Sequence, residues 1–262
     1  MSVELTFPVQ GAALVLGGSG GAGSMICQTL ARAGTPVAFT YYKGSKRADA
    51  TLAAIKEIGV ACSAHAIDGS DSGAVKKLVG EVVARYGGLH TAIYAAGPLI
   101  DFLPVSEAQP EQWLRFMNSD AASVFNLAHA TMPHLRKAQG SFTACVTFAN
   151  RRVLDCDGLS AAPKAAVESL IRQLAAEEGK YGVRANSVGL GWIDVGVGNA
   201  QTEHSLHTTF GPAALDYLRQ IIRLQGRPGT GQEFANAVVF FASQQASYIT
   251  GQAVMVDGGG SL

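Results

Sequence analysis

The sequence predicts an α/β fold in which one domain is built on a seven-stranded parallel sheet flanked by helices. Short apolar or β-branched segments alternate along the chain with longer alanine-rich segments of helical period, which is the pattern of βαβ units. No linker, internal repeat or low-complexity stretch interrupts this alternation. The 262 residues are enough for one large α/β domain, and we expect residues 1–262 to form it.

Each expected element follows from its own stretch of sequence. The strands are short apolar or β-branched segments such as ALVL, expected at residues 12–16, 36–41, 61–67, 91–95, 142–148, 184–188 and 253–256. The helices fill the stretches between them and are expected at residues 22–33, 46–58, 72–86, 111–137, 161–178 and 232–243. Residues 191–229 break the pattern with glycines, prolines and two histidines. Because such an insertion in an open α/β sheet usually covers the ligand, we expect it to cover the substrate.

Composition excludes several classes of protein. The 20 basic and 20 acidic side chains balance, so no net charge attracts nucleic acid or an anionic membrane. The apolar runs fall far short of the ~20 residues that span a bilayer, and the N-terminus lacks the pattern of a signal peptide. The four cysteines have no ligand-like or disulfide-like spacing, and His204 and His207 lack a nearby Cys or paired carboxylate. We therefore expect a cytoplasmic protein with no metal, no nucleic acid and no membrane partner.

The first expected strand leads into a glycine-rich stretch, LGGSGGAG, which opens the first helix. Its glycines fit two phosphate-binding spacings, G-x-G-x-x-G from Gly18 and G-x-x-x-G-x-G from Gly17, and also the G-x-S-x-G nucleophile elbow around Ser19. Glycines between a strand and a helix let the backbone approach a pyrophosphate, whose charge the helix N-terminus stabilises. The elbow needs an oxyanion loop upstream, and the short segment before Ser19 leaves no room for one. The stretch therefore favours a nucleotide site over a hydrolase.

The end of the second expected strand indicates which dinucleotide is bound. Folds that prefer NAD place an acidic side chain here to bind the ribose 2′-hydroxyl. This chain instead has YYKGSKR, with Lys43, Lys46 and Arg47 and no acid before Asp49. Cationic side chains bind a 2′-phosphate well, so we expect NADP(H) to be preferred over NAD(H). A solvated basic loop is the alternative interpretation.

The remaining motifs occur in a recognisable order. YAAG at 94–97 stands where a family pattern has NNAG, Asp68 follows the third strand, and GRPGTGQEFANAVVFFAS precedes SYITGQAVMVDGG near the C-terminus. With the glycine loop, these motifs make the chain resemble the short-chain dehydrogenase/reductase family over nearly its whole length. The resemblance implies a Rossmann-type doubly wound sheet, an NAD(P)(H) cofactor, a small-molecule substrate and a homotetramer or homodimer. It implies that the cofactor is bound by Gly17, Ser19, Gly20, Gly21, Ala22, Gly23, Tyr42, Lys43, Ser45, Arg47, Asp68, Gly69, Ala95, Ala96, Gly97, Lys164, Gly191 and Ile193.

The catalytic residues depart from the family pattern. The family uses an Asn, a Ser, a Tyr and a Lys, with the Tyr and Lys on one helical face so that the ammonium stabilises the phenolate. The resemblance assigns these four roles to Asp120, Thr147, Ser160 and Lys164, so only the lysine is retained. The threonine that would hold the nicotinamide carboxamide is replaced by Val195.

A serine at position 160 changes the chemistry that we expect. A tyrosine hydroxyl titrates near ~10 and is brought toward neutrality by an adjacent cation, whereas a serine hydroxyl is not tuned so far. Ser160 is also shorter by a ring, so a water linked to Thr147, Ser160 and Lys164 could fill the gap before a substrate carbonyl. Arg151 and Arg152 could attract an anionic substrate such as an acyl carrier thioester, or form surface ion pairs. The alternative proton donors near in sequence are Arg151, Arg152, Asp155 and Asp157.

Three functions are compatible with these residues. The first is an NADP-dependent oxidoreductase that acts on a small carbonyl or hydroxyl compound with a non-standard proton donor. The second is a nucleotide-binding protein without redox turnover, serving as a regulator or structural subunit. The third is a lyase or isomerase that reuses the cleft with Lys164 and a carboxylate. The intact glycine loop favours bound nucleotide, so the first function is preferred although the altered catalytic residues argue against standard turnover.

Overall fold

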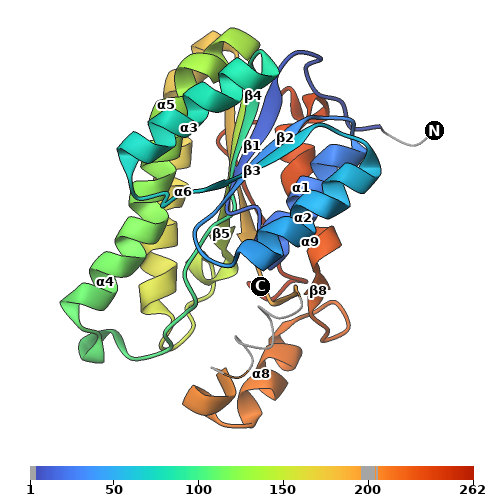
Figure 1. Cartoon of the computed structure of the whole chain (residues 1–262). Coiled ribbons are helices and arrows are strands. Elements are labelled where there is room, and N and C mark those ends of the chain that lie inside the picture. Colours follow the sequence, from blue (N-terminus) through green and yellow to red (C-terminus); the bar gives the residue numbers. More distant parts are fainter. Residues whose placement is uncertain (1–3, 196–203, 205) are drawn as a thin grey trace.

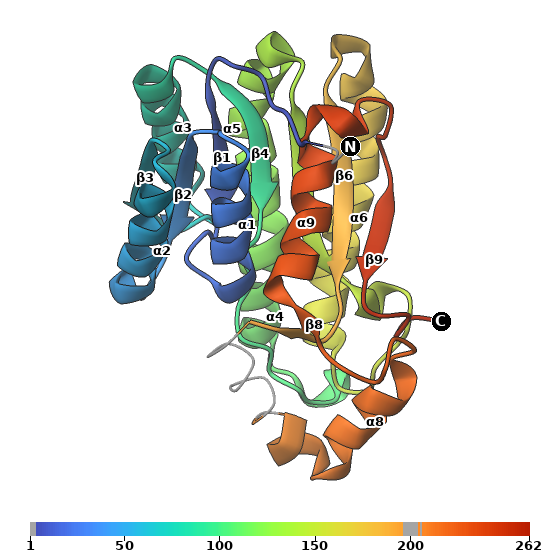
Figure 2. The ribbon, with the colours of Figure 1, turned by 90° about the vertical axis from the view of Figure 1, so that its right-hand side faces the viewer.

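The computed structural model, which describes residues 4–195, 204 and 206–262, is centred on one parallel sheet. Its strands lie side by side in a single order (Figure 2). That order is β3 (Cys62–Ala66), β2 (Val37–Tyr41), β1 (Ala12–Leu16), β4 (Leu89–Tyr94), β5 (Ser141–Thr147), β6 (Arg184–Leu190) and β9 (Ala253–Val256). Every pairing between neighbours is parallel, and the strand order reverses between β1 and β4. The predicted doubly wound, seven-stranded Rossmann-type sheet is therefore confirmed.

Helices cover both faces of this sheet (Figure 1). One face carries α1 (Gly21–Arg32), α2 (Ser45–Ile58) and α9 (Gly231–Ala242), and the other carries α3 (Ser72–Tyr86), α5 (Ser123–Ala138) and α6 (Gly158–Glu178). Successive side chains of a strand point to opposite faces, so Leu14 joins the core under α3, α5 and α6 while Val15 joins the core under α1, α2 and α9. No helix among the described residues is long and apolar enough to cross a membrane.

The helix expected at 111–137 is divided in the structure. It consists of α4 (Pro110–Met117), a π-helical turn at Asn118–Ala122, and α5. The apolar period continues through all three parts, so the sequence pattern did not show the division. A π-turn inserts an extra residue and often marks a functional position. Here it places Asp120, one of the predicted site residues, in the protein interior with 1% of its surface exposed.

The helix expected at 161–178 begins three residues earlier than predicted, at Gly158. Ser160 therefore lies inside the first turn, and Asp157 occupies the position just before the helix. Pro163 falls within the helix rather than near its start. Its missing N–H leaves the carbonyl of Leu159 without the usual partner four residues later, which the sequence pattern alone did not reveal.

The segment expected to be a loop insertion, 191–229, contains regular structure. It includes β7 (Ile193–Asp194), which pairs in parallel with β8 (Gly229–Thr230). It also includes α8 (Ala213–Ile221), which lies beyond the carboxyl ends of the strands (Figure 1). Residues 196–203 and 205 of this segment lie outside the described residues. The predicted position over the substrate site stays a prediction that the location of α8 supports.

Arg184, at the start of β6, anchors the C-terminal end of α9 to the sheet. Its guanidinium donates hydrogen bonds to the carbonyl oxygens of Phe241, Ala242 and Ser243 at 2.7, 3.2 and 2.8 Å. These are the last carbonyls of α9 and the residue after it, which have no partner within the helix. Burial lowers the pKa of Arg184, yet the partners keep its charge hydrogen-bonded.

We predict that Arg184→Ala lowers the free energy of unfolding by about 3 kcal/mol, because a part-buried charged donor and three carbonyl contacts are lost together. Urea denaturation followed by circular dichroism measures the change. Arg219→Ala is the matched control, since the Arg219 side chain forms an exposed pair with Asp216, and its cost should stay below about 0.5 kcal/mol. Equal stability of the two variants would contradict the anchoring role.

Candidate functional site

Close backbone packing holds the loop between β1 and α1 in shape. Gly17 has φ +92°, and a Cβ there would lie 2.7 Å from the backbone nitrogen of Ala96. A Cβ at Gly23 would lie 2.2 Å from the Gly17 carbonyl oxygen, so both positions require glycine. The hydroxyl of Thr40 accepts a hydrogen bond from the Gly17 N–H at 3.0 Å, which ties the loop to β2. The loop is therefore rigid before any ligand arrives.

The outer side of the same loop can receive an anion. A Cβ at Gly20 would touch only the Gly17 carbonyl oxygen, at 3.4 Å, so this position remains open. Gly20 is the N-cap of α1, and the first turn of α1 contains no acidic residue. The free N–H groups and the dipole at a helix N-terminus stabilise a phosphate. The loop thus fits the pyrophosphate of a dinucleotide, while Val195 packs against Gly21 at its edge.

A groove continues from this loop across the ends of β2 and β3. It has a volume of about 670 Å³. Its lining includes seven of the predicted cofactor residues: Gly17, Tyr42, Lys43, Asp68, Gly69, Ala96 and Gly97. Lys43 lies over the exposed ring of Tyr42, at 5.2 Å from its centroid. The groove has the position and the cationic side chain expected for the adenosine half of the cofactor.

Other predicted cofactor residues do not line this groove. Ser45 and Arg47 are exposed at the start of α2, and the Arg47 guanidinium lies near Gly44. Gly191 packs against Asp257, and Ile193 is 6% exposed within the core. The structure therefore places these four around the cleft without bringing them to the described cavities. Their cofactor roles stay predictions.

The four predicted catalytic residues meet at a second cavity, of about 170 Å³. It is lined by Thr147 from the end of β5, Ser160 and Lys164 from α6, and Asp120 from the π-turn. Parallel registers explain the meeting, because Leu16, Tyr94 and Thr147 end neighbouring strands at one edge of the sheet. The cavity also touches Ala22, Ala95, Ala96 and Gly97. The catalytic cavity thus adjoins the glycine loop.

Lys164 is bound to a carboxylate within this cavity. Its Nζ lies 2.6 Å from Oδ1 of Asp120, and the two side chains are 12% and 2% exposed. The Tyr94 hydroxyl donates to the same Oδ1 at 2.5 Å and also contacts the carbonyl oxygen of Ser119 at 3.1 Å. Burial, followed by the Asp120 charge, raises the pKa of Tyr94 well above its usual value. Tyr94 therefore stays protonated and remains a donor to Asp120.

Sequence reasoning missed the role of Tyr94. Tyr94 is fully buried and stands at the first position of YAAG, where the family pattern begins with asparagine. Asp120 likewise stands at the asparagine position of the catalytic set. These two replacements are hydrogen-bonded to one another, so the signal was a paired departure from the family motifs. In this chain the Lys164 ammonium is therefore bound to the Asp120 carboxylate. The family pattern instead has a tyrosine phenol one helical turn before the lysine.

Asp157 is a buried carboxyl group beside Ser160. It is 4% exposed, and its Oδ1 has no hydrogen-bond partner in the described part of the chain. Burial raises the pKa of Asp157 to about 7, although the Ser160 hydrogen bond and the Lys164 charge lower it. Asp157 is thus protonated in a substantial fraction of molecules at neutral pH. Asp155, another of the alternative donors, is exposed.

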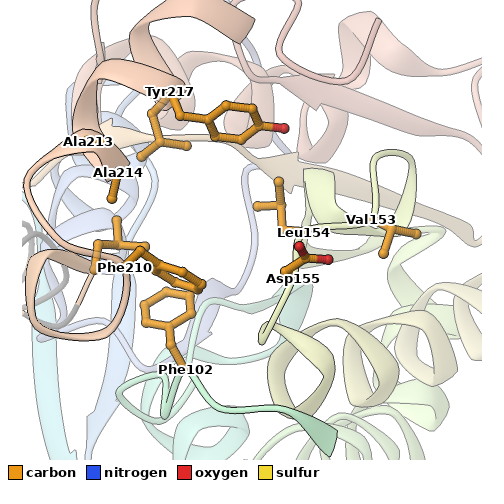
Figure 3. A pocket seen from close by; sticks show the side chains of 10 residues that line it. Phe102, Val153, Leu154, Asp155, Phe210, Ala213, Ala214 and Tyr217 are labelled. Atoms are coloured by element: carbon orange, nitrogen blue, oxygen red, sulfur yellow. The ribbon is translucent and has the colours of Figure 1, made fainter.

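A third cavity, of about 460 Å³, is lined mostly by apolar side chains. Figure 3 shows Phe102 and Phe210 on one side, with Leu154 and Asp155 across the space and Tyr217 of α8 at a third side. The rings of Phe102 and Phe210 meet edge to face with centroids 5.9 Å apart. Its walls come from loops after β4 and β5 and from α8. This is the part of the molecule suited to an apolar substrate.

The two arginines after β5 are engaged elsewhere. Arg151 forms a two-pronged ion pair with Glu168 of α6, with contacts of 2.5 and 3.3 Å. Arg152 donates to the backbone oxygen of Leu262 at the C-terminus. The predicted alternative of ion pairs is therefore confirmed for Arg151. His204 and His207 are exposed, and no group of metal-ligating side chains occurs in residues 4–195, 204 and 206–262.

Known proteins resemble this chain over most of its length. A family model described as Enoyl-(Acyl carrier protein) reductase matches residues 17–261. The 3-oxoacyl-(acyl-carrier-protein) reductase FabG of Staphylococcus aureus is 30% identical over 94% of this chain and 96% of that protein. The 1-cyclohexenylcarbonyl-CoA reductase of Streptomyces collinus is 30% identical over 95% of this chain and 86% of its own length. A short-chain dehydrogenase/reductase structure from Serratia marcescens, 29% identical, superposes with a TM-score of 0.87 and covers 98% of this chain and 100% of that one.

The buried carboxyl of Asp157 predicts a pH-dependent stability. Its pKa is 3.8 in an ordinary setting and about 7 in the folded protein, so between these values the folded state retains a proton that the unfolded chain has lost. The free energy of unfolding should therefore fall as pH rises from about 4 to about 7, by on the order of 4 kcal/mol. Asp157→Asn should remove this contribution, because an amide does not ionise.

Urea denaturation at a series of pH values measures this slope as the difference between wild type and Asp157→Asn. Asp216→Asn is the matched control, since the Asp216 side chain is 68% exposed and its removal should leave the wild-type slope. Parallel curves for wild type and Asp157→Asn would show that Asp157 titrates at its ordinary pKa.

The Asp120–Lys164 pair predicts strong coupling between two substitutions. Lys164→Met leaves a buried carboxylate without its ammonium and should cost about 3 kcal/mol of folding stability. Asp120→Asn combined with Lys164→Met should recover about 2 kcal/mol of this loss, because no uncompensated charge remains. A double-mutant cycle measured by urea denaturation tests the pair. Additive effects would mean that the two groups do not interact in solution.

Proposed function

This chain belongs to the short-chain dehydrogenase/reductase family, and we propose that it is an NADP(H)-dependent oxidoreductase that acts on a carbonyl or hydroxyl group of a largely apolar substrate. The observation that carries the proposal is that three spaces lie at the edge of the sheet where the strands end. The glycine loop and its groove suit a dinucleotide. The catalytic cavity holds the predicted catalytic residues and shares Ala96 and Gly97 with that groove, and the apolar cavity is lined by the loops after β4 and β5. The names of the two 30%-identical relatives describe reductases, which supports reduction as the direction.

The residues that would hold the cofactor fall into two groups. Gly20 and the N-terminus of α1 would receive the pyrophosphate, since this side of the loop is open and lacks acid. Lys43, with Lys46 and Arg47 close behind it in sequence, would bind a ribose 2′-phosphate, because these cations face no neighbouring carboxylate in the YYKGSKR stretch. The expected role of Lys164 at the nicotinamide ribose would require it to share its ammonium with Asp120.

The substrate would lie with its reacting group in the catalytic cavity and its apolar part between Phe102, Leu154 and Tyr217. When bound, the nicotinamide cofactor supplies the hydride. The protein supplies position and a proton: Thr147 and Ser160 present hydroxyl groups to the reacting oxygen, and Lys164 supplies positive charge close to it. Asp155 is the exposed acidic side chain at the apolar cavity and would favour a substrate with a hydroxyl or amine at its far end.

One observation supports a second function, that of a nucleotide-binding protein without redox turnover. Lys164 is neutralised by Asp120, and Ser160 replaces the family's tyrosine, so the chain could bind nucleotide without redox turnover. The two functions differ in one measurement. NADPH oxidation with a panel of apolar ketones supports the oxidoreductase, whereas tight NADPH binding without oxidation on any ketone supports the binding protein.

Apolar side chains on α4 and α5 support the expected homotetramer or homodimer. Trp113, Leu114 and Phe125 are 39%, 56% and 56% exposed in the single chain. Large apolar side chains exposed together often mark an interface between subunits. We propose self-association through this surface, to be checked by sedimentation of the purified protein.

We predict that NADPH binds at least about tenfold more tightly than NADH. Two or three charge-assisted contacts between a 2′-phosphate and Lys43, Lys46 or Arg47 supply the difference. Isothermal titration calorimetry of both cofactors measures it. Lys43→Ala should reduce the preference by weakening NADPH alone, and Lys77→Ala, on the far helix α3, is the control that should change neither affinity. Equal affinities for the two cofactors in the wild-type protein would overturn the NADP assignment.

A further inference from the structure

We propose that Asp157 supplies the proton for carbonyl reduction through the hydroxyl of Ser160, in place of the family's tyrosine. The inference rests on the proposed oxidoreductase function and names the proton source that this function requires. Ser160 lines the catalytic cavity together with Thr147 and Lys164. Asp157 does not line this cavity, and it acts on the substrate through the Ser160 hydroxyl.

The backbone places these two side chains together. Asp157 immediately precedes α6 and Ser160 is three residues later, in the first turn. The Ser160 N–H and the Ala161 N–H both bond the Asp157 carbonyl oxygen, at 3.1 and 2.9 Å, which sets the start of the helix. The carboxyl does not cap the helix; the Ser160 side chain three residues later is close enough to lower its pKa. One carboxyl oxygen is left buried without a partner, as expected for a group whose protonation state changes.

The surrounding charges favour proton transfer from this carboxyl. Lys164, on the same helix, is the cation whose field acts on Asp157. From the facing elements, Asp120 of the π-turn neutralises Lys164, and the Tyr94 hydroxyl at the end of β4 is bonded to Asp120. Burial therefore outweighs attraction by Lys164, and the Asp157 carboxyl holds its proton up to a pKa of about 7. A donor of this strength is suited to acid catalysis at neutral pH.

The cavity has room for a substrate oxygen to reach Ser160. Its walls extend beyond Thr147 to Cys145 and Val146, deeper along β5. A tyrosine ring at position 160 would project from the same turn of α6 toward the reacting group, and the shorter serine leaves that space to the substrate. The hydroxyl of Ser160 then contacts the reacting oxygen directly, while the side chain of Asp157 remains covered with 4% of its surface exposed.

The reaction balances with the reduced nicotinamide cofactor as the hydride donor. The carbonyl carbon gains the hydride, and the electron pair of the C=O π bond moves to the oxygen. That oxygen takes the proton of the Ser160 hydroxyl as Ser160 takes the proton of Asp157. The products are the alcohol, the oxidised cofactor and the Asp157 carboxylate, which solvent reprotonates before the next turnover. In the oxidation direction the same carboxylate accepts the proton.

The test compares three single variants with the wild-type protein. Asp157→Asn and Ser160→Ala change the proposed proton path, and Asp216→Asn is the control at an exposed carboxylate. Steady-state reduction of a panel of apolar ketones by NADPH is measured from pH 5 to 9, a range of about two units on either side of the expected pKa. Wild type should lose kcat as pH rises through about 7, because the Asp157 proton is lost. Asp157→Asn should lower kcat at pH 6 by about 10²-fold and remove this pH dependence, while Asp216→Asn keeps the wild-type profile.

An independent readout follows the carboxyl itself. Carbon-13 NMR of aspartate-labelled protein should show one carboxyl that titrates near pH 7 in wild type and disappears in Asp157→Asn. Ser160→Ala should move this titration to higher pH, because the Ser160 hydrogen bond favours the ionised form. A merely structural role for Asp157 would give the same carboxyl titration without a fall of kcat at the same pH, so the two measurements are read together.

The outcomes separate the inference from the proposed function. NADPH binding with ketone reduction that Asp157→Asn leaves unchanged would overturn the role of Asp157 and keep the oxidoreductase. No aspartate titrating near neutral pH would also overturn it, even if Asp157→Asn fails to fold. Absence of NADPH binding, or binding without turnover on the whole panel, would overturn the proposed function and the inference together. Loss of the pH dependence in Asp157→Asn, with NADPH affinity retained, supports both.

Discussion

All seven strands of the main sheet run in the same direction, and the location of the site depends on this constraint. Parallel pairing requires each strand to be followed by a crossover, so the loops after β1, β4, β5 and β6 leave from one edge. Hydrogen bonds fix their relative height: the N–H of Ala95 bonds the carbonyl oxygen of Leu16 at 2.8 Å, and Thr147 is paired with Leu190. The glycine loop, the YAAG turn and the catalytic cavity are therefore assembled by the sheet.

Within that frame, charge pairing distinguishes this chain from the family pattern. In the family's arrangement the lysine ammonium stabilises a phenolate one turn earlier on its helix. Here the Asp120 carboxylate binds the Lys164 ammonium at 2.6 Å, and the Tyr94 hydroxyl donates a hydrogen bond to the same carboxylate. A buried pair of this kind is stable only while both partners are present. The loss of the tyrosine at position 160 and the gain of Tyr94 and Asp120 are physically connected, because each concerns what the ammonium contacts.

Desolvation explains how a carboxyl group takes over acid chemistry. An exposed aspartate is ionised at neutral pH and has no proton to donate. Removing Asp157 from water disfavours its charged form, and the nearby ammonium of Lys164 is largely balanced by Asp120, so burial dominates. The same pairing that removes Lys164 from its familial role thus helps to keep Asp157 protonated. The Asp120–Lys164 pair thus bears both on the changed partner of Lys164 and on the protonation of Asp157.

The sequence by itself determined the fold, the glycine loop and the set of residues at the catalytic positions, because periodicity and motif spacing are local properties of the chain. It assigned Thr147, Ser160, Lys164 and Asp120 to the catalytic positions, and in the structure these four residues line one cavity. Only the tertiary structure decided what those residues contact. The bond from Tyr94 to Asp120 joins two separate elements, and the π-turn at Asn118–Ala122 and the burial of Asp157 were not visible in the sequence pattern. Burial and hydrogen bonding depend on neighbours brought together by packing, and no local pattern of residues encodes them.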